Sequence, residues 1–353
     1  MTTPLIEAVS VSRRFSRKLD YAEKIARALG ANLQDRTVHA VDDVDLSVMP
    51  GEVVGLVGES GCGKSTLGRM MAGIMPVSDG EVRWKGNALP LLKGEEKRAA
   101  RLAAQMIFQD PMSTLNPRKR VIDLIGEAPR VHGLVTRRET RDYVADITRR
   151  VGLDPSYLDR YPHQFSGGQR QRIGIARALA VRPDLLVCDE SVAALDVSIQ
   201  AQILNLFMDL KQEFGLTYLF ISHDLGVVKH ICDRVVVMYL GRIVESAAPD
   251  DLFAAPKHPY TEALIRELPE IGDRKRVFTP IRGEIPSPLH PPAGCHFHPR
   301  CPMAFDRCRV ERPRLQATGP GHVSACHLND PIPAPTTTLP VQPVTITKKG
   351  TDL

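Results

Sequence analysis

The first third of the chain changes between strand-like and helix-like spacing of apolar residues. Apolar and polar side chains alternate over residues 5–15 and again over Val38–Val48, which predicts two half-buried strands. The apolar run Val53–Val57 predicts a buried strand, and Leu67–Met71 continues as a helix. In the polar segment 16–36, apolar residues recur at helical spacing, so the pattern indicates a surface helix of no readable role.

The middle of the chain continues this rhythm with an interruption. Polar helical stretches broken by proline and glycine over about 111–165 predict an inserted helical subdomain. Strands alternating with helices predict an α/β fold with a largely parallel, doubly wound sheet. The remaining expected elements are strands at Glu81–Trp84, Met106–Phe108, Leu185–Cys188 and Tyr218–Ile221, and helices near 94–105, 168–181 and 198–214.

The alternation of predicted strands and helices ends at about Pro249. We therefore expect a core domain over 1–248 and a small second domain over 249–330. Residues 280–328 are rich in proline, cysteine and histidine, and a small domain of this kind needs a metal or disulfides for stability. The tail 331–353 is predicted to be disordered.

The composition is that of a soluble globular protein. The chain of 353 residues is 43% hydrophobic and 25% charged. No stretch reaches the ~18 uninterrupted apolar residues of a spanning helix, and the polar N-terminus lacks the apolar core of a secretion signal. The net charge of +5 is mild, and no dense basic block appears, so we expect no nucleic-acid partner.

The chemistry centres on a glycine-rich stretch that fits the phosphate-loop pattern G-x-x-x-x-G-K-S/T. The expected strand before it and helix after it are the context that the motif requires. Glycines let backbone N–H groups face phosphate oxygens, Lys64 reaches the β- and γ-phosphates, and the Ser65 hydroxyl binds Mg²⁺. The predicted nucleotide-binding residues are Gly58, Glu59, Ser60, Gly61, Cys62, Gly63, Lys64, Ser65 and Thr66.

Hydrolysis needs acidic groups as well, and two carboxylates follow an apolar strand downstream. Asp189 at the end of this strand is placed to hold Mg²⁺ through water. Glu190, one residue further on, is placed to accept a proton from the attacking water. Two solvated acids would be the default interpretation without the phosphate loop upstream.

With these motifs in order, the chain resembles the ATP-binding subunits of ABC transporters. The stretch that begins at Phe165 is similar to their signature motif, although leucine is commoner than phenylalanine at its start. The resemblance implies that two such chains close face to face, so that each signature binds the ATP of the other chain. It also implies a P-loop core with an added antiparallel subdomain. The signature residues are Ser166, Gly167, Gly168 and Gln169.

The resemblance assigns three further positions. Gln109 matches the glutamine that contacts Mg²⁺ and water, Asp196 matches the loop that crosses the dimer interface, and His223 matches the histidine that contacts the γ-phosphate. Phe15 is the expected adenine-stacking aromatic, with Tyr21 as the alternative. Proline usually follows the catalytic glutamate in this family, whereas this chain has Ser191.

Several sequence stretches outside the shared motifs resemble those of one branch of the family, the oligopeptide/dipeptide importer ATPases of the OppF/DppF type. This resemblance covers nearly the whole chain, from about residue 5 to residue 328. The matching stretches are Gln109–Arg118, Tyr161–Phe165, His258–Thr261 and Pro286–Leu289. This implies a second, different ATPase subunit, two membrane permeases and an external binding protein as partners.

Seven cysteines are present, and the last four crowd near the C-terminus. Four thiolates are able to hold a [4Fe–4S] cluster or a structural zinc. The resemblance implies the [4Fe–4S] centre, and neighbouring histidines leave mixed ligation open. The expected ligands are Cys295, Cys301, Cys308 and Cys326.

We therefore interpret the chain as an ATPase subunit on the cytoplasmic face of the bacterial inner membrane that powers peptide import. The alternatives are the same machine carrying nickel, glutathione or another small solute, an exporter ATPase, and a soluble ABC ATPase acting on nucleic acid or ribosomes. The last class usually carries two ATPase halves or a long coiled coil, and this sequence shows neither.

Overall fold

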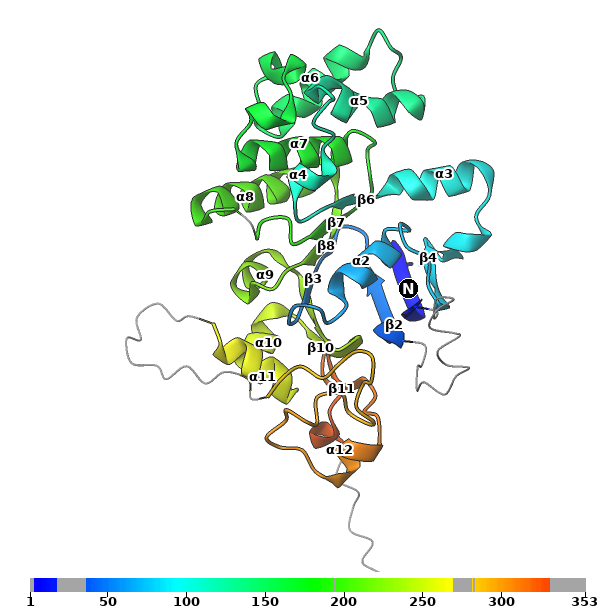
Figure 1. Cartoon of the computed structure of the whole chain (residues 1–353), viewed down its shortest axis with the longest axis vertical. Helices are drawn as coiled ribbons and strands as arrows, with labels where there is room; N and C mark the ends of the chain where they lie inside the picture. Colours follow the sequence, from blue (N-terminus) through cyan, green and yellow to red (C-terminus); the bar gives the residue numbers. More distant parts are fainter. Residues whose placement is uncertain (1–2, 18–35, 194, 269–280, 282, 331–353) are drawn as a thin grey trace, which may run out of the picture.

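The computed structural model describes residues 3–17, 36–193, 195–268, 281 and 283–330. Its strands form two sheets (Figure 1). The strands are β1 (Ile6–Arg17), β2 (Arg36–Val48), β3 (Val53–Val57), β4 (Asp79–Trp84), β5 (Asn87–Ala88), β6 (Ala104–Ile107), β7 (Leu185–Asp189), β8 (Thr217–Ile221), β9 (Arg234–Tyr239), β10 (Arg242–Ala247), β11 (Gln316–Gly319) and β12 (His322–Ser324).

Helices cover both sides of the larger sheet, as the α/β rhythm predicts. The sequence pattern predicts a helix in 16–36, but Ser16 and Arg17 belong to β1 and Arg36 begins β2, while residues 18–35 and the tail 331–353 lie outside the described residues. The described α-helices are α2 (Lys64–Met71), α3 (Gly94–Ala103), α4 (Pro111–Thr114), α5 (Val121–Val131), α6 (Thr140–Arg150), α7 (Gly167–Leu179), α8 (Val197–Phe214), α9 (Leu225–Ile231), α10 (Pro249–Ala254), α11 (Pro259–Arg266) and α12 (Asp306–Val310).

The larger sheet has eight strands in the order β11-β12-β10-β9-β3-β8-β7-β6. Neighbouring strands from β9 to β6 run parallel, whereas β9, β10, β12 and β11 pair antiparallel. Strand β3 lies between β8 and β9, so the loop that follows it emerges from the interior of the parallel part. Parallel strands are covered on both faces, which explains the unbroken apolar runs of β3, β7 and β8.

Successive residues of each central strand enter two different cores. In β8, Tyr218 and Phe220 pack with α8, while Leu219 and Ile221 face the other side. That other core joins the inner face of the smaller sheet, β2-β1-β4-β5, to α2 through residues such as Met70. Helix α2 is therefore held between two sheets, and the residue that begins it has little freedom to move.

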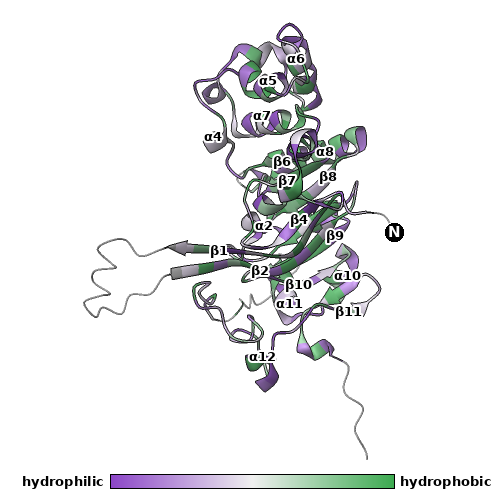
Figure 2. Cartoon of the chain, turned by 90° about the vertical axis from the view of Figure 1, so that its right-hand side faces the viewer, coloured by the Kyte–Doolittle hydropathy of each residue, from purple (hydrophilic) through white to green (hydrophobic). Residues whose placement is uncertain are grey.

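Two segments extend away from this central body. Helices α5 and α6 lie together beyond α7 at the top of Figure 1, and their buried side chains, among them Ile125 and Val144, continue the core that contains α8. Strands β1 and β2 pair over their whole length as an antiparallel hairpin that projects from the molecule in Figure 2. In the described part of the chain, no helix is long and apolar enough to cross a membrane.

The region after Pro249 is joined to the core by the sheet itself. Strand β12 pairs with β10, and Glu245 of β10 is fully buried there. The Glu245 carboxylate accepts hydrogen bonds from the backbone N–H groups of Lys257 and His258, at 2.5 and 3.0 Å, and lies 2.7 Å from Nε2 of His322. A buried carboxylate is tolerated only with such partners, so Glu245 ties two C-terminal segments, residues 257–258 and strand β12, to the core.

We expect His322→Ala to lower the free energy of unfolding by about 2 kcal/mol, because the buried Glu245 carboxylate loses one of its hydrogen-bond partners. Denaturant unfolding followed by circular dichroism measures this. The matched control is the exposed His230, where the same substitution should change stability by less than about 0.5 kcal/mol. Equal stability of the two variants would show that the Glu245–His322 contact is not stabilising.

Candidate functional site

The predicted phosphate loop connects β3 to α2, and its glycines are needed for geometric reasons. Gly58 and Gly63 have φ angles of +148° and +108°, which favour glycine. A Cβ atom on Gly58 would lie 2.1 Å from the carbonyl oxygen of Met238, and one on Gly63 would lie 2.1 Å from that of Ala40. The loop is therefore in direct backbone contact with β2 on one side and β9 on the other.

Lys64, the first residue of α2, points back into the loop. Its side chain is buried, and Nζ donates hydrogen bonds to the carbonyl oxygens of Gly58 and Glu59, at 2.7 and 2.9 Å. The ammonium charge is thus fixed inside the curve of the loop. A cation at this point, together with the positive end of a helix dipole, makes an anion-binding site.

Two of the three residues predicted to contact Mg²⁺, Ser65 of α2 and Asp189 of β7, are in contact with each other. The Ser65 hydroxyl donates a hydrogen bond of 2.6 Å to Oδ1 of Asp189, which ends β7. Burial raises the pKa of the Asp189 carboxyl, and the Ser65 hydrogen bond partly offsets this. A hydroxyl and a carboxylate are oxygen ligands of the kind that Mg²⁺ prefers.

Gln109 lies with the catalytic candidates instead of the Ser65–Asp189 pair. Its Nε2 donates a hydrogen bond of 2.9 Å to Oε2 of Glu190, and Nδ1 of His223 lies 3.6 Å from the same oxygen. The three side chains come from the ends of β6, β7 and β8, three neighbouring parallel strands. The structure therefore brings together a carboxylate, an amide and an imidazole beside the Ser65–Asp189 pair.

Glu190 has a strained backbone. Its φ is +47°, a left-handed conformation that is uncommon for residues other than glycine. Such strain persists where the surroundings impose it, and it is frequent at functional sites. The backbone N–H of Glu190 donates to the carbonyl oxygen of Ile221 at 3.0 Å, which anchors the strained residue to β8.

The signature residues and Asp196 lie together in a second patch. Ser166 caps the N-terminus of α7 by accepting a hydrogen bond from the N–H of Gln169, and Asp196 caps α8 through the N–H of Ile199. A Cβ atom on Gly168 would lie 2.7 Å from Ile199, so the starts of the two helices are adjacent. Ser166, Gly167 and Asp196 are exposed, which leaves this patch open to another molecule.

The adenine-stacking candidate lies on the long hairpin. Phe15 pairs with Val38, two residues before the Ala40 carbonyl that contacts the phosphate loop. Its ring is 38% exposed, and the guanidinium of Arg13 lies 4.8 Å from the ring centroid. Tyr21, the alternative, lies outside the described residues.

The four C-terminal cysteines line one small cavity of about 10 Å³, together with Phe297 and His327. All four are free thiols, and burial raises the pKa of Cys295, Cys301 and Cys326, in the last case to about 11. Among the residues that the structure describes, no three or more His, Cys, Asp or Glu side chains are arranged as a metal site. The fold thus brings the four thiols together, but their arrangement among the described residues does not support the expected [4Fe–4S] cluster.

Two residues that the sequence analysis did not identify contact the phosphate loop. Arg300 forms an ion pair with Glu59, and the Tyr260 hydroxyl accepts a hydrogen bond from the backbone N–H of Glu59. Arg300 follows Glu59 by 241 positions, and no local pattern marks it. Tyr260 lies in the stretch His258–Thr261, which the resemblance marked without giving it a role. Only the folded chain shows these contacts.

Comparison with family models places two families on the chain. The model described as ABC transporter matches residues 41–193. The model described as oligopeptide/dipeptide transporter, C-terminal region, matches residues 244–308. The first match contains the phosphate loop, Asp189, Glu190 and the signature residues, and the second contains three of the four C-terminal cysteines.

Comparison with curated proteins identifies relatives from the same family. The chain is 52% identical over 299 residues to a probable peptide ABC transporter ATP-binding protein, y4tS, of Sinorhizobium fredii, with 84% of each chain covered. It is 50% identical over 295 residues to the oligopeptide transport ATP-binding protein AppF of Bacillus subtilis, covering 82% of this chain and 90% of AppF.

Solved structures of ABC transporter proteins resemble about 70% of this chain. CbiO1 of Clostridium perfringens, part of the ABC transporter complex cbiONQ, matches with a TM-score of 0.58 at 26% identity and covers 72% of this chain and 92% of its own. The dimeric structure of MJ0796, a bacterial ABC transporter cassette, matches with a TM-score of 0.57 at 25% identity, covering 69% and 98%.

We expect Gly63→Ala to weaken ATP binding by about 10-fold or more, because the added methyl group collides with the Ala40 carbonyl and the loop must deform. Titration with a fluorescent ATP analogue measures this. Gly61→Ala is the matched control: Gly61 also has a positive φ, of +77°, but a Cβ atom there meets nothing within 4 Å. An equal loss in both variants would mean that the collision does not matter.

Proposed function

The chain belongs to the ATP-binding subunits of ABC transporters, and on that premise we propose that it hydrolyses ATP to drive the import of di- and oligopeptides across a bacterial inner membrane. The observation that carries this proposal is the identity of about 50% over more than four fifths of the chain with ATP-binding proteins named for peptide transport. The match of residues 244–308 to the oligopeptide/dipeptide transporter region supports the same branch.

In the proposed ATP site, the phosphate loop holds the triphosphate and the Lys64 ammonium balances its negative charge. Ser65 and Asp189, already hydrogen-bonded to each other, would hold Mg²⁺, with Gln109 as a further oxygen ligand. Bound there, the ion would neutralise charge on the β- and γ-phosphates. The other proposed contacts come from Phe15 and from the backbone of residues 58–66.

Glu190 is the proposed general base. Its carboxylate is held by the Gln109 amide at 2.9 Å and faces the His223 ring, so it is oriented without being buried. A positioned carboxylate can accept a proton from the attacking water, and His223 is proposed to contact the γ-phosphate. The strained backbone at Glu190 fixes the direction of this side chain.

We propose that a second ATPase subunit completes each site. The exposed Ser166 and Asp196 lie together at the starts of α7 and α8, and Val197 beside them is 83% exposed. The similar MJ0796 structure is described as dimeric. By analogy with the peptide branch, the partner would be a different ATPase chain, and two permeases and an external binding protein would complete the transporter at the membrane. The names of the relatives favour peptides over nickel, glutathione or another solute.

We further propose that Cys295, Cys301, Cys308 and Cys326 hold a metal centre in a Cys-rich C-terminal region, either a [4Fe–4S] cluster or zinc. Four free thiols on one cavity are a donor set that fits both. The proposed role is structural, since the described residues from 283 to 330 form only two short strands, one short α-helix and one 3-10 turn.

Glu190→Gln should retain ATP binding and lower the rate of hydrolysis by about 100-fold or more, because the amide cannot accept the proton of water. With ATP bound and hydrolysis blocked, the ATPase pair should accumulate in a closed, dimeric form. Steady-state phosphate release and size-exclusion chromatography in Mg-ATP measure the two effects. Hydrolysis at the parental rate would exclude Glu190 as the base.

Lys64→Ala serves as the matched control for this experiment, because it should abolish ATP binding itself. In cells that depend on this chain, both variants should abolish uptake of a labelled peptide and leave uptake of a labelled amino acid unchanged. Peptide uptake that persists in both would contradict the proposed transport function while leaving the ATPase assignment intact.

Protein purified without oxygen should contain about four irons and four sulfides per chain if the thiols hold a cluster, or about one zinc if they hold a structural metal. Cys301→Ser should lose this metal, whereas Cys232→Ala should keep it, because Cys232 is buried in the core beside α9. Elemental analysis and the visible spectrum measure the content. Parental protein without metal would contradict the proposal.

A further inference from the structure

Two side chains of the C-terminal region form hydrogen bonds with one residue of the phosphate loop, Glu59. The Glu59 carboxylate receives two hydrogen bonds from Arg300, from Nη1 at 2.7 Å and from Nη2 at 3.0 Å. The backbone N–H of the same residue donates to the Tyr260 hydroxyl at 2.8 Å. A bidentate arginine–carboxylate pair fixes orientation as well as distance, so both the side chain and the backbone of Glu59 are held.

The Arg300–Glu59 pair is largely shielded from water and is supported by aromatic packing. The Arg300 side chain is only 4% exposed, and that of Glu59 is 21% exposed. The Arg300 guanidinium lies 5.9 Å from the Tyr239 ring centroid, and Tyr239, Tyr260 and Phe297 pack against one another with centroids 4.6 to 5.3 Å apart. Because of this shielding, the pair is little screened by salt, and its geometry is over-determined by its neighbours.

A second chain of contacts reaches the loop from the same region. Nδ1 of His296 lies 2.9 Å from the carbonyl oxygen of Leu240, and since a carbonyl only accepts, Nδ1 carries the proton. The next residue, Gly241, donates its backbone N–H to the carbonyl oxygen of Cys62 in the loop, at 2.9 Å. The C-terminal region thus contacts the loop directly and also holds the β9–β10 turn against it.

The Arg300 guanidinium neutralises the negative charge of the Glu59 carboxylate. A carboxylate within a loop that binds a triphosphate would repel the ligand if it were unpaired. Arg300 compensates this charge, and it reaches Glu59 from the C-terminal region and not from the loop itself. The sequence predicts Glu59 only as a nucleotide-binding residue, and the fold shows that Arg300 is its counter-charge.

We propose that Arg300 and Tyr260 are positioning residues for ATP binding, which hold the phosphate loop in its binding shape through Glu59 and cancel the Glu59 charge. The inference rests on the proposed function, in that the loop binds ATP. Because the loop is held before the nucleotide arrives, less conformational freedom is lost on binding. The C-terminal region therefore contributes to nucleotide affinity through its contacts with Glu59.

Arg300→Met should raise the Kd for Mg-ATP by about 10-fold, a size typical of coupling between two sites, and leave kcat at saturating ATP within about 3-fold. Arg300→Lys keeps the charge but not the bidentate geometry, so its Kd should be intermediate. Adding Glu59→Gln to Arg300→Met removes the unpaired carboxylate and should recover part of the affinity. Fluorescent-nucleotide titration and steady-state kinetics on the full chain measure both quantities.

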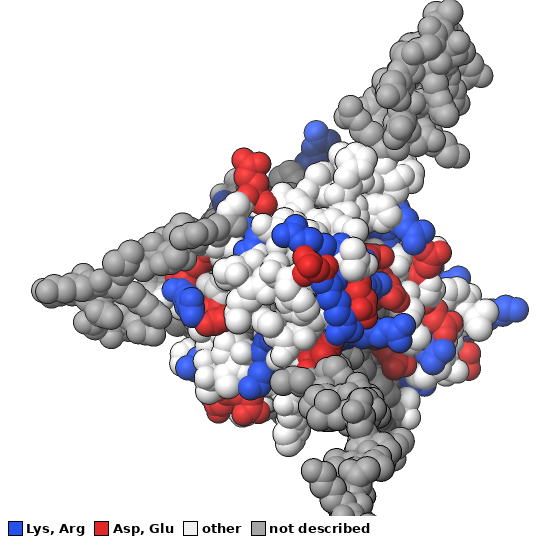
Figure 3. Space-filling view, turned by 90° about the horizontal axis from the view of Figure 1, so that it is seen from below, with Lys and Arg blue, Asp and Glu red and all other residues white. Residues whose placement is uncertain are grey.

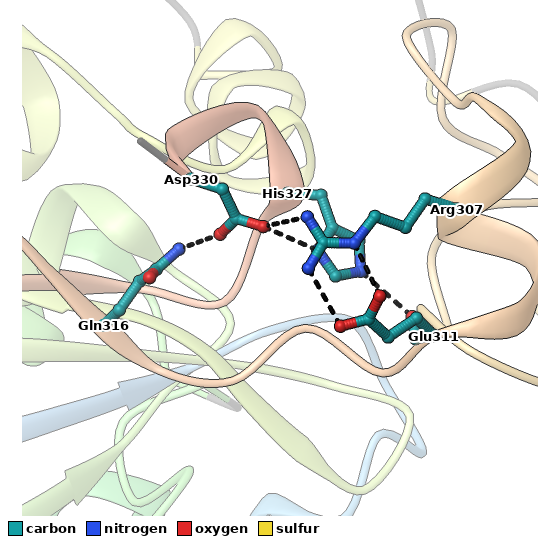
Figure 4. Close-up of polar contacts among 5 residues, drawn as sticks. All are labelled: Arg307, Glu311, Gln316, His327 and Asp330. Atoms are coloured by element: carbon teal, nitrogen blue, oxygen red, sulfur yellow. Dashed lines mark hydrogen bonds and ion pairs between the residues drawn. The ribbon is translucent and has the colours of Figure 1, made fainter. Parts of the chain in front are cut away.

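Arg307→Met is the matched control. Arg307 belongs to the same C-terminal region but pairs with Glu311, at 2.6 and 2.9 Å, and with Asp330, at 2.5 Å, in a network that also includes Gln316 and His327 (Figure 4). The face seen in Figure 3 shows basic and acidic side chains interspersed, so pairs of this kind are ordinary there. The Arg307 side chain is 44% exposed, and both Glu311 and Asp330 lie outside the phosphate loop, so the control should bind Mg-ATP as the parental protein does.

The outcomes separate this inference from the proposed function. If Lys64→Ala abolishes binding while Arg300→Met leaves the Kd unchanged, the positioning role is wrong and the ATP site stands. If Arg307→Met raises the Kd as much as Arg300→Met does, the effect is a general one of the region and the inference is overturned. Metal content and thermal unfolding of each variant are measured in parallel. Should Arg300→Met fail to fold, a parental Kd in Arg300→Lys would contradict the inference, and an intermediate one would support it.

Discussion

The close backbone packing around the phosphate loop is the constraint on which the rest of the structure depends. The loop passes so near to its neighbours that at Gly58 and Gly63 a single methyl group would overlap a carbonyl oxygen of another strand. This contact requires β2 and β9 to lie on fixed sides of the loop, and α2 to begin where it does. The two-sheet architecture, with α2 between the sheets, satisfies that requirement, and the proposed catalytic side chains then lie at the ends of the neighbouring strands.

The site combines groups that are individually unfavourable. Asp189 is buried, Glu190 has a left-handed backbone, and Glu59 places a negative charge in an anion-binding loop. Each is compensated by a specific partner: a serine hydroxyl, a β8 carbonyl oxygen and a distant arginine. A fold that stabilises such groups is pre-organised for its ligand, because the cost of arranging the charges is met by folding and not by binding.

The sequence predicted the elements whose burial leaves a continuous apolar run, such as Val53–Val57, and it predicted the α/β class that these runs imply. The motifs also placed Ser65 and Asp189 in the same predicted site, and the two are in contact because the carboxyl ends of parallel strands lie at one side of the sheet. It did not predict β9 and β10, where the rhythm of strand and helix gives way to a hairpin. Nor did it predict the Glu59–Arg300 pair, because ion pairs between residues 241 positions apart leave no periodic signal.

The C-terminal region continues the main sheet, and this has a consequence for the nucleotide-binding part taken alone. Strand β12 covers the outer side of β10 with backbone hydrogen bonds. A chain cut after residue 248 would expose β10 as an unpaired edge strand, a template for pairing with other chains. The same cut would leave the buried carboxylate of Glu245 without the groups that solvate it. Strands β11 and β12 thus cover a sheet edge that would otherwise be open to pairing and aggregation.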